Sequence, residues 1–269
     1  MLYWLLYQVL YHYFTPFRIF RYLTFRTAFA SLTALFMGLI IGPAIIRKLR
    51  EFQIGQYIRE EGPQAHQKKA GTPTMGGVLI VVSFVIPTLL WADLSNKYVW
   101  LVLFSTTAFA SIGFADDYLK MKHRRNLGLT GRSKLMLQIL TAVIVAVVLI
   151  LFQAQGDYST HLVVPFFKKF RPDLVFSGLM GKWHLWPIAF LPFIGFVVLV
   201  LVGSTNAVNL TDGLDGLAIG CTVVAAGALT VLTYVSGHAL FADYLELPRM
   251  PQVGELAVFC GAMVGSAIG

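Results

Sequence analysis

Long apolar stretches alternate with short polar segments along this sequence. Several stretches reach about 20 residues, the length an α-helix needs to cross a bilayer, and in lipid a helix satisfies all its own backbone groups. We predict an all-α, polytopic transmembrane helix bundle forming a single membrane domain over residues 1–269, with about six complete spans and a truncated seventh. The predicted spans are Tyr22–Ile46, Met75–Trp91, Tyr98–Ala115, Leu135–Phe152, Trp186–Val208 and Leu214–Val235, followed by an apolar run from Glu255.

The composition supports a membrane protein. Hydrophobic residues make up 57% of the chain and charged residues 13%, and the mean hydropathy is +0.71, which is unusual for a soluble domain. Cys221 and Cys260 both lie in apolar runs and indicate no disulfide framework. Residues 1–14 are apolar and aromatic without a basic start or a cleavage site, so we interpret them as an interfacial segment.

Basic residues are concentrated in two segments between the predicted spans. Residues 47–74 and 116–134 hold six each of the 21 Lys and Arg residues, whereas residues 92–97, 153–185 and 236–254 hold six together. Because basic loops stay in the cytoplasm, the first two segments are predicted to be cytoplasmic, and the turn before the sixth span then lies at the same face. Basic residues in such short loops do not suggest a nucleic-acid partner.

Glycines precede the second predicted span in the run Gly71-Thr-Pro-Thr-Met-Gly-Gly77. Backbone amides at glycines can approach an anion closely, and Lys68 and Lys69 just before them add positive charge, as phosphate binding requires. A simple turn before a helix is the alternative explanation.

Two adjacent carboxylates stand at the end of the third predicted span, in Asp116-Asp117-Tyr-Leu-Lys120. Adjacent carboxylates repel, so such a pair is stable where a divalent cation or basic neighbours offset its charge. The alternative is a solvated helix end neutralised by Lys120 and Lys122.

The run Asn206-Ala-Val-Asn-Leu-Thr-Asp212-Gly-Leu-Asp215-Gly-Leu217 places amides and carboxylates at three-residue spacing between two apolar stretches. Polar groups bordering a bilayer core are costly unless they are paired, hydrated or coordinated, so we predict a functional site. Three-residue steps drift around a helix, so we expect a helix break, with Asp212 capping the next helix. The structural alternative is a cap combined with interhelical amide hydrogen bonds.

Together, Asp116-Asp117-x-x-Lys120 and Asn206-x-x-Asn209-x-x-Asp212-Gly-x-Asp215-Gly-Leu217 resemble the motifs of the polyprenyl-phosphate N-acetylhexosamine-1-phosphate transferases. The run Lys69-x-Gly-Thr-Pro-Thr-Met-Gly-Gly77 resembles the branch that transfers phospho-N-acetylmuramoyl-pentapeptide. The resemblance covers the whole chain and implies a ten-helix fold in the bacterial inner membrane, with its active site on the cytoplasmic face. It also implies that UDP-MurNAc-pentapeptide and undecaprenyl phosphate react with Mg²⁺ to give lipid I and UMP in peptidoglycan synthesis, and it suggests a homodimer among membrane lipids.

The same resemblance implies roles for individual residues. Asp116 is expected to act as the base or positioning carboxylate for the lipid phosphate, and Asp117 to help organise the charge, with both carboxylates as expected metal ligands. Whether Asp116 accepts a proton or forms a covalent bond is left open. Lys69 and Lys120 are expected to hold diphosphate oxygens. The residues expected at the nucleotide pocket are Asn209, Asp212 and Asp215, with Thr74 nearby.

The last apolar run, from Glu255 to the end of the sequence at Gly269, contains 15 residues. This is short of the roughly 20 residues of a span, and the resemblance implies further helices, a third aspartate and a histidine-rich loop that this sequence lacks. We therefore expect this 269-residue chain alone to have lost most or all activity, although the protein it comes from is expected to be an enzyme. UMP release by the chain alone would refute that expectation.

Two other functions fit part of the pattern. A sister transferase that uses UDP-GlcNAc shares the aspartate motifs, although residues 72–77 argue against it. A transporter would use intramembrane carboxylates as coupling sites, but it would not need a second acidic motif beside lysines. Residues 153–185 mix Pro, aromatic and basic residues without a long apolar run, and we predict an interfacial hairpin or short helix there.

Overall fold

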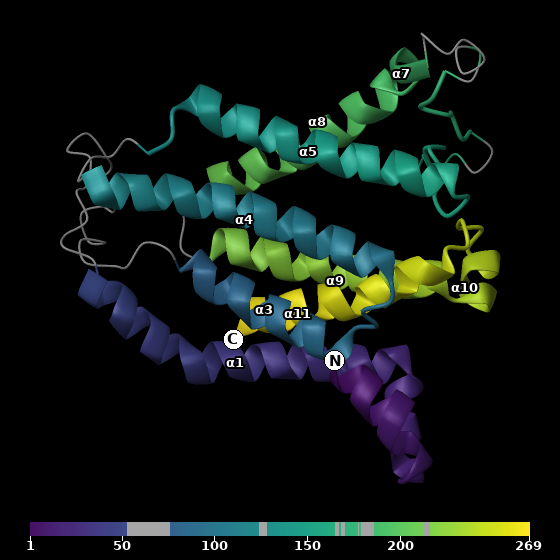
Figure 1. Ribbon diagram of the computed structural model, residues 1–269, viewed down its shortest axis with the longest axis horizontal. Coiled ribbons are helices and arrows are strands. Elements are labelled where there is room, and N and C mark those ends of the chain that lie inside the picture. The colour runs from purple at the N-terminus through teal and green to yellow at the C-terminus, as the bar shows by residue number, and fades with distance from the viewer. Residues whose placement is uncertain are drawn as a thin grey trace. The chain divides into compact units, whose positions relative to one another are not determined.

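The computed structural model describes residues 1–52, 76–123, 128–164, 167, 170–176, 178, 186–211 and 216–269 (Figure 1). Regular structure in these residues is helical, apart from an isolated antiparallel bridge between His161 and Asp173. The chain divides into two compact units, one of Met1–Thr130 with Leu214–Gly269 and one of Gly131–Gly213. The fold class is therefore the predicted all-α bundle, while the predicted single domain stays a prediction.

Apolar helices dominate both units. Among the described residues, six helices are long and apolar enough to cross a membrane, and α3 is a shorter apolar helix of 15 residues. The chain is thus an integral membrane protein. The first unit contains α1 (Leu23–Phe52), α3 (Gly77–Trp91), α4 (Lys97–His123), α9 (Leu217–Gly237), α10 (Ala239–Tyr244) and α11 (Leu256–Ile268), and the second contains α5 (Gly131–Ala154), α7 (Trp186–Ala189) and α8 (Leu191–Thr211).

Two predicted spans differ from the observed helices in an informative way. Helix α4 continues two turns past the predicted end at Ala115, because Asp116, Asp117 and Lys120 pair along the helix surface and do not end it. The predicted span from Trp186 is interrupted at Phe190, between α7 and α8. Pro192 explains the restart, since proline lacks an N–H and fits the first turn of a helix.

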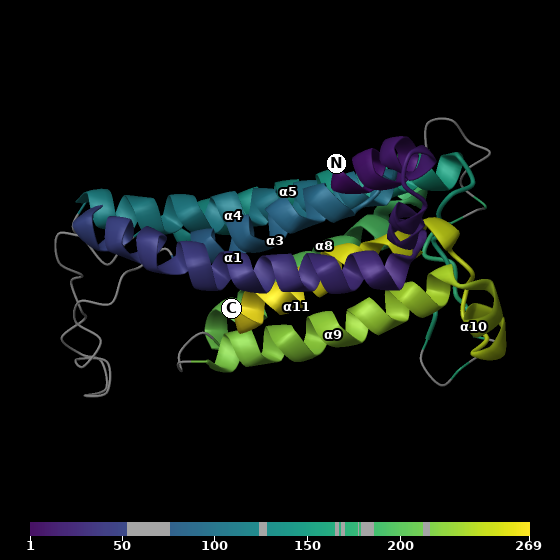
Figure 2. The same ribbon diagram turned by 90° about the horizontal axis from the view of Figure 1, so that it is seen from below.

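Helix α11 forms the centre of the first unit, where it packs against α1, α3 and α9 (Figure 2). Its contact with α1 depends on glycines at four-residue spacing, which share one helix face. A Cβ at Gly265 would lie 1.9 Å from the Ser31 carbonyl oxygen, and one at Gly261 would lie 2.6 Å from the Thr27 methyl group. Small residues let the two backbones meet closely, as is common between membrane helices.

A buried ion pair joins the beginnings of α1 and α11. Arg26 is 4% exposed, its Nη2 donates to Glu255 Oε2 at 3.0 Å, and its Nη1 donates to the Trp91 carbonyl at 3.2 Å. Glu255 Oε1 also accepts from the backbone N–H of Asp93 at 2.7 Å. The guanidinium lies 4.1 Å from the ring centroid of Tyr3, so the N-terminal segment covers this pair.

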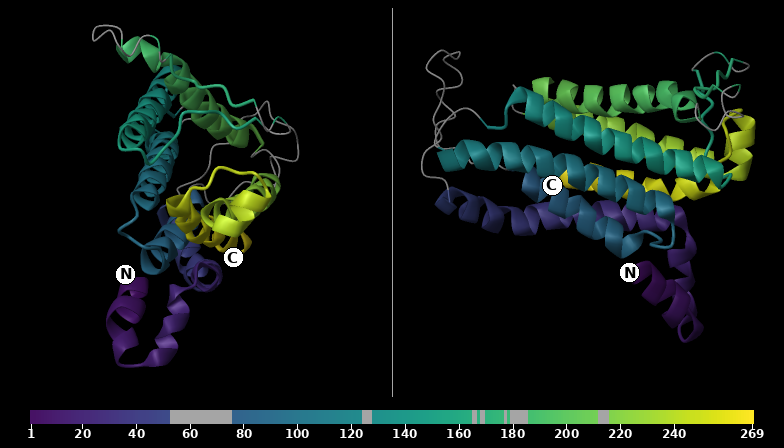
Figure 3. Two further views of the ribbon diagram at one scale, coloured as in Figure 1. Left: turned by 90° about the vertical axis from the view of Figure 1, so that its right-hand side faces the viewer. Right: turned by 45° about the horizontal axis from the view of Figure 1, so that its top comes forward.

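The N-terminal segment consists of three short helical turns that fold back on one another beside α1 (Figure 3). They are η1 (Trp4–Val9), η2 (Leu10–His12) and η3 (Thr15–Arg21). Trp4, Tyr13 and Phe14 are all more than half exposed. Exposed aromatic residues next to the start of a span are consistent with the interfacial role predicted for this segment.

The second unit packs α5 against α8 and places the segment after α5 over a small apolar cluster. The bridge between His161 and Asp173 brings two extended stretches of this segment together, as in the hairpin alternative predicted for residues 153–185, and the interfacial position of the segment stays a prediction. Asp173 Oδ1 closes the hairpin by accepting from Thr160 Oγ1 at 2.7 Å and from the Val175 N–H at 3.0 Å. Tyr158 anchors it on α8, with its ring 6.0 Å from that of Phe193.

Candidate active site

Two carboxylates and one lysine form an ion-paired cluster in the last turns of α4. Lys120 Nζ lies 2.7 Å from Asp116 Oδ2 and 3.1 Å from Asp117 Oδ1. The three- and four-residue spacings bring all three side chains together on the helix surface. One cation therefore offsets two carboxylates that would otherwise repel each other near the negative end of the helix dipole.

The Asp116 carboxylate is buried against the segment that follows α4. Asp116 is 8% exposed, and its Oδ1 accepts from the backbone N–H of Leu129 at 2.8 Å. A Cβ at Gly128 would lie 2.3 Å from the same oxygen, so only glycine fits there without movement. With Lys120 at Oδ2, both oxygens of Asp116 are engaged and its orientation is held from two sides.

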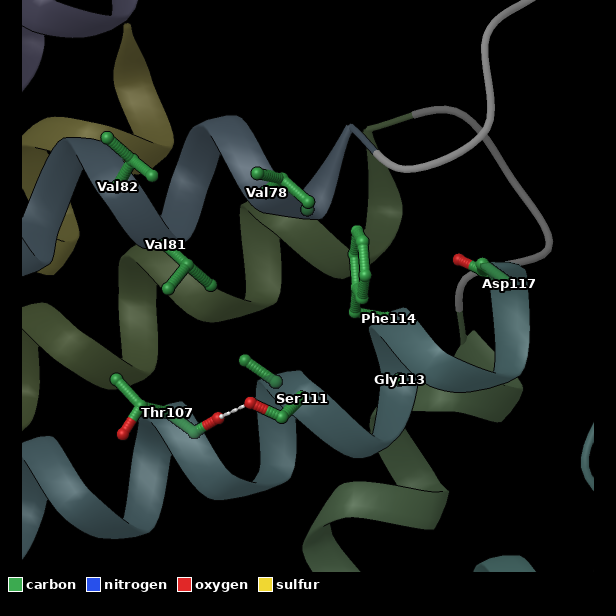
Figure 4. A pocket seen from close by; sticks show the side chains of 10 residues that line it. Val78, Val81, Val82, Thr107, Ser111, Gly113, Phe114 and Asp117 are labelled. Atoms are coloured by element: carbon green, nitrogen blue, oxygen red, sulfur yellow. Dashed lines mark hydrogen bonds between the residues drawn. The ribbon is translucent and has the colours of Figure 1, made fainter. Parts of the chain in front are cut away.

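The Asp117 carboxylate faces an apolar pocket between α3 and α4. The side chain of Asp117 is 39% exposed and lines this cavity of about 470 Å³. Figure 4 shows Val81 of α3 pointing toward α4 and Asp117 at the end of the pocket beyond Phe114. Gly77, the last residue of the predicted phosphate-binding run, also lines the pocket. The structure thus brings the start of α3 and the acidic end of α4 together within one unit.

The first amide of the Asn206 run has a structural role. Asn206 Nδ2 donates to Gln138 Oε1 of α5 at 2.9 Å and to the Val202 carbonyl at 2.8 Å, and Gln138 is 2% exposed. The alternative of interhelical amide bonding is therefore correct for this residue. Asn209 lies one turn later in α8 and is exposed. The helix continues through both residues to Thr211, so the expected break does not fall between them.

The remaining site residues lie outside the described part of the chain: Lys69, Thr74, Asp212 and Asp215. The N-cap of α9 is Gly216, in the left-handed conformation at φ 82°, and it makes no side-chain capping bond. The prediction that the three polar segments meet at one membrane face stays a prediction, since it depends on these residues and on both units.

Three residues that contact Asp116 or Asn206 were not predicted from the sequence. Gly128 and Leu129 contact Asp116 from a short connection, and Gln138 lies within an apolar run. A single glutamine in a membrane-length apolar stretch is a usable signal, because such a group needs a hydrogen-bond partner. Gly128 carries no such signal, since one glycine in a loop is commonplace.

The carboxylates are of the kind that magnesium requires. Mg²⁺ prefers oxygen ligands and is commonly held by one or two carboxylates together with water and substrate phosphates. The accessible carboxylate of Asp117 and the buried carboxylate of Asp116 beside it provide oxygen ligands of this kind. Among the described residues, no three His, Cys, Asp or Glu side chains cluster as a self-contained metal site.

Comparison with known proteins is consistent with this geometry. Residues 99–269 match glycosyl transferase family 4, and residues 69–81 match signature 1 of the phospho-N-acetylmuramoyl-pentapeptide-transferases. A transferase of that name from Koribacter versatilis is 73% identical over 271 residues, covering 100% of this chain and 72% of the relative. Its counterpart from Acidobacterium capsulatum is 70% identical, and the match covers 100% of this chain and 71% of the relative. The counterpart from Desulfatibacillum aliphaticivorans is 51% identical, and the match covers 97% of this chain and 70% of the relative.

The fold and the acidic cluster thus define a membrane-embedded phospho-sugar transferase of the glycosyl transferase 4 type. Within that class, the chain belongs to the phospho-N-acetylmuramoyl-pentapeptide-transferase family.

Proposed function

We propose that this protein transfers phospho-N-acetylmuramoyl-pentapeptide from UDP-MurNAc-pentapeptide to undecaprenyl phosphate, which yields lipid I and UMP. The observation that carries the proposal is the cluster of Asp116, Asp117 and Lys120 at the end of an apolar pocket, in a chain of this family. Transfer between a lipid-soluble and a water-soluble substrate needs charged groups at the edge of an apolar site. We place this site on the cytoplasmic face of the bacterial inner membrane because the basic segments flank it.

In the reaction, an oxygen of the prenyl phosphate attacks the sugar-linked phosphorus of the UDP substrate. A new phosphorus–oxygen bond forms, the bond to the UMP phosphate breaks, and UMP leaves. Such transfer depends on in-line positioning and on neutralising several phosphate charges. Lys120 supplies one positive charge, and Lys69 is proposed to supply another. Mg²⁺ held by Asp117 with Asp116 would supply the Lewis acidity that offsets the remaining charge.

The two carboxylates differ in how they can take part. Asp117 is accessible and lines the pocket, which favours direct contact with the acceptor phosphate or the metal. Asp116 is buried with both oxygens engaged, which favours a role in fixing Lys120, and as a second metal ligand it would share one oxygen with the Leu129 N–H or with Lys120. The base role predicted for Asp116 remains a proposal, and a phosphoryl adduct trapped on Asp116 would overturn it in favour of a covalent mechanism. Asn209, Asp212, Asp215 and Thr74 are proposed to line the nucleotide pocket.

The test is UMP release from UDP-MurNAc-pentapeptide and undecaprenyl phosphate by the purified protein in lipid, and a separate assay of the 269-residue chain alone tests its expected inactivity. We expect release to require both substrates, to stop with EDTA and to return with Mg²⁺. If the protein is instead the sister transferase, UDP-GlcNAc should be the better donor. Competition between UDP-MurNAc-pentapeptide and UDP-GlcNAc therefore distinguishes the two transferase functions. A transporter would release no UMP under any of these conditions. The homodimer suggested by the resemblance is tested separately by the mass of the detergent-purified particle.

A further inference from the structure

The pocket between α3 and α4 has walls suited to a hydrocarbon ligand. Val78, Val81 and Val82 contribute aliphatic side chains from α3, and Ala110 and Phe114 contribute from α4 (Figure 4). Phe114 is 47% exposed and stacks on Tyr118, with ring centroids 6.2 Å apart. Apolar surface of this kind favours a ligand without polar groups along its length.

The two hydroxyl residues in the wall do not alter that character. Ser111 Oγ donates to the Thr107 carbonyl at 2.7 Å, and Thr107 Oγ1 donates to the Leu103 carbonyl at 2.7 Å. Both hydroxyl hydrogens are thereby used within α4 and are not directed at a ligand. The described lining residues therefore offer few of the convergent polar groups with which a sugar or peptide would be bound.

Among the described lining residues, charge lies at one end of the pocket. Asp117 lines that end and is paired with Lys120, which also binds Asp116. These two carboxylates and one lysine carry a net negative charge, so a divalent cation between them and a phosphate would favour phosphate binding there. A ligand complementary to the whole pocket therefore has a hydrocarbon chain, a phosphate at its end and a requirement for a divalent metal.

The match to the family signature covers the same wall. Residues 69–81 include Gly77, Val78 and Val81, all of which line the pocket. A segment that marks this transferase family thus forms part of the apolar surface, which favours a substrate over an ordinary membrane lipid. The volume of about 470 Å³ lies within the usual range of about 300–1,000 Å³ for small-ligand pockets, and is far too small for a whole undecaprenyl chain.

We propose that this pocket binds the isoprene units next to the phosphate of the prenyl phosphate acceptor, with the phosphate at the Asp117 end and the rest of the chain in the bilayer. The assignment rests on the proposed function and specifies where its lipid substrate is held. Val81, Ala110, Gly113 and Phe114 then contact the reacting lipid close to its phosphate and select a prenyl chain of suitable width.

Gly113 allows this pocket to be filled without disturbing the fold. A Cβ at Gly113 would meet no atom within 4 Å, and glycine is a poor helix former, so Gly113→Leu places side-chain volume in the pocket at no cost to α4. Gly227→Leu is the matched control, because Gly227 lies mid-helix in α9 of the same unit, also has open space at its Cβ and does not line the pocket. Ala110→Phe fills the same pocket from the next helical turn, should Gly113→Leu fold poorly.

The experiment uses a prenyl phosphate with a photoreactive diazirine in one of its first isoprene units and the wild-type protein in phospholipid vesicles. Cross-linked peptides are identified by mass spectrometry, with and without Mg²⁺. We expect label on residues 78–82 and 110–114, dependent on Mg²⁺ and displaced by undecaprenyl phosphate but not by undecaprenol. Gly113→Leu should reduce this label about tenfold or more, and raise the KM for prenyl phosphate while leaving that for the UDP substrate unchanged. Gly227→Leu should change neither.

Different results would overturn the assignment. If a diazirine phospholipid labels the pocket equally and undecaprenyl phosphate does not compete, the occupant is ordinary bilayer lipid. If no probe labels the pocket while UMP release proceeds, another part of the protein fills it. Both outcomes overturn the pocket assignment and leave the proposed function intact, whereas absence of UMP release in the wild-type protein overturns the proposed function and the assignment with it.

Discussion

The buried carboxylate of Asp116 accepts a hydrogen bond from the backbone of Leu129, and the preceding residue, Gly128, leaves no room for a Cβ beside that carboxylate. Because a Cβ at Gly128 would lie 2.3 Å from Asp116 Oδ1, Gly128→Ala must displace either the carboxylate or the Leu129 N–H bonded to it. Displacements of about 1 Å at reacting groups can cost about a hundredfold in rate, so we predict a fall in kcat of that order. UMP release measures kcat, and the KM of the UDP substrate should change much less.

The matched control for that substitution is three residues further along the chain. Gly131 has no atom within 4 Å of its Cβ position, so Gly131→Ala should retain wild-type kcat. Equal loss of kcat in both variants would mean that Asp116 is insensitive to the contact with Gly128. A matching loss of thermal stability in Gly128→Ala would instead indicate a purely structural role for that glycine.

At the scale of helices, the close contact between α1 and α11 leads us to predict a loss of unfolding free energy when Gly265 is enlarged. Gly265→Ala would place a Cβ 1.9 Å from the Ser31 carbonyl oxygen, so the two helices must separate. Overpacking of this kind typically costs about 1–3 kcal/mol of unfolding free energy. Unfolding in mixed detergent micelles measures the loss. Gly227→Ala, in open space on α9, should be neutral or stabilising by up to about 1 kcal/mol.

The hydrogen bond between Gln138 and Asn206 joins α5 to α8 and can be isolated by a double-mutant cycle. We predict a coupling free energy of about 0.6 kcal/mol, and no more than about 1.7 kcal/mol, between Gln138→Leu and Asn206→Leu, as for other polar contacts between membrane helices. Unfolding of the wild type, the two single variants and the double variant provides this value. A coupling of zero would mean that the two side chains stabilise the unit independently.

At the scale of the whole molecule, the sequence anticipates the helices better than the contacts between them. Trp91 was predicted correctly as the end of its helix, because the apolar run stops there before the turn that contains Asp93. The extension of α4 past Ala115 was missed because a charge is a poor guide to where a helix ends. Periodicity cannot show that Gly128 contacts Asp116, since the contact depends on how a short connection returns to its own helix.

At the candidate site, too, the sequence revealed the motif but not the surroundings of its side chains. Asp116, Asp117 and Lys120 were singled out from the sequence as one motif, and the structure shows Lys120 paired with both carboxylates. Their spacing could not reveal that one carboxylate is buried while the other lines a pocket, because that depends on what packs against each side of α4. The apolar pocket was also not foreseen, since its valines look like any other membrane-facing residues.

The ion pair between Arg26 and Glu255 joins residues 229 positions apart and secures the first unit at one end. Glu255→Gln leaves the buried Arg26 without a counter-charge, and breaking a buried pair in this way typically costs about 3–5 kcal/mol. Replacing both partners, as Arg26→Met with Glu255→Met, removes the unpaired charge and should recover most of that loss. Unfolding in mixed micelles compares the variants. A double variant no more stable than Glu255→Gln would show that Arg26 stabilises the protein mainly through its contacts with Trp91 and Tyr3.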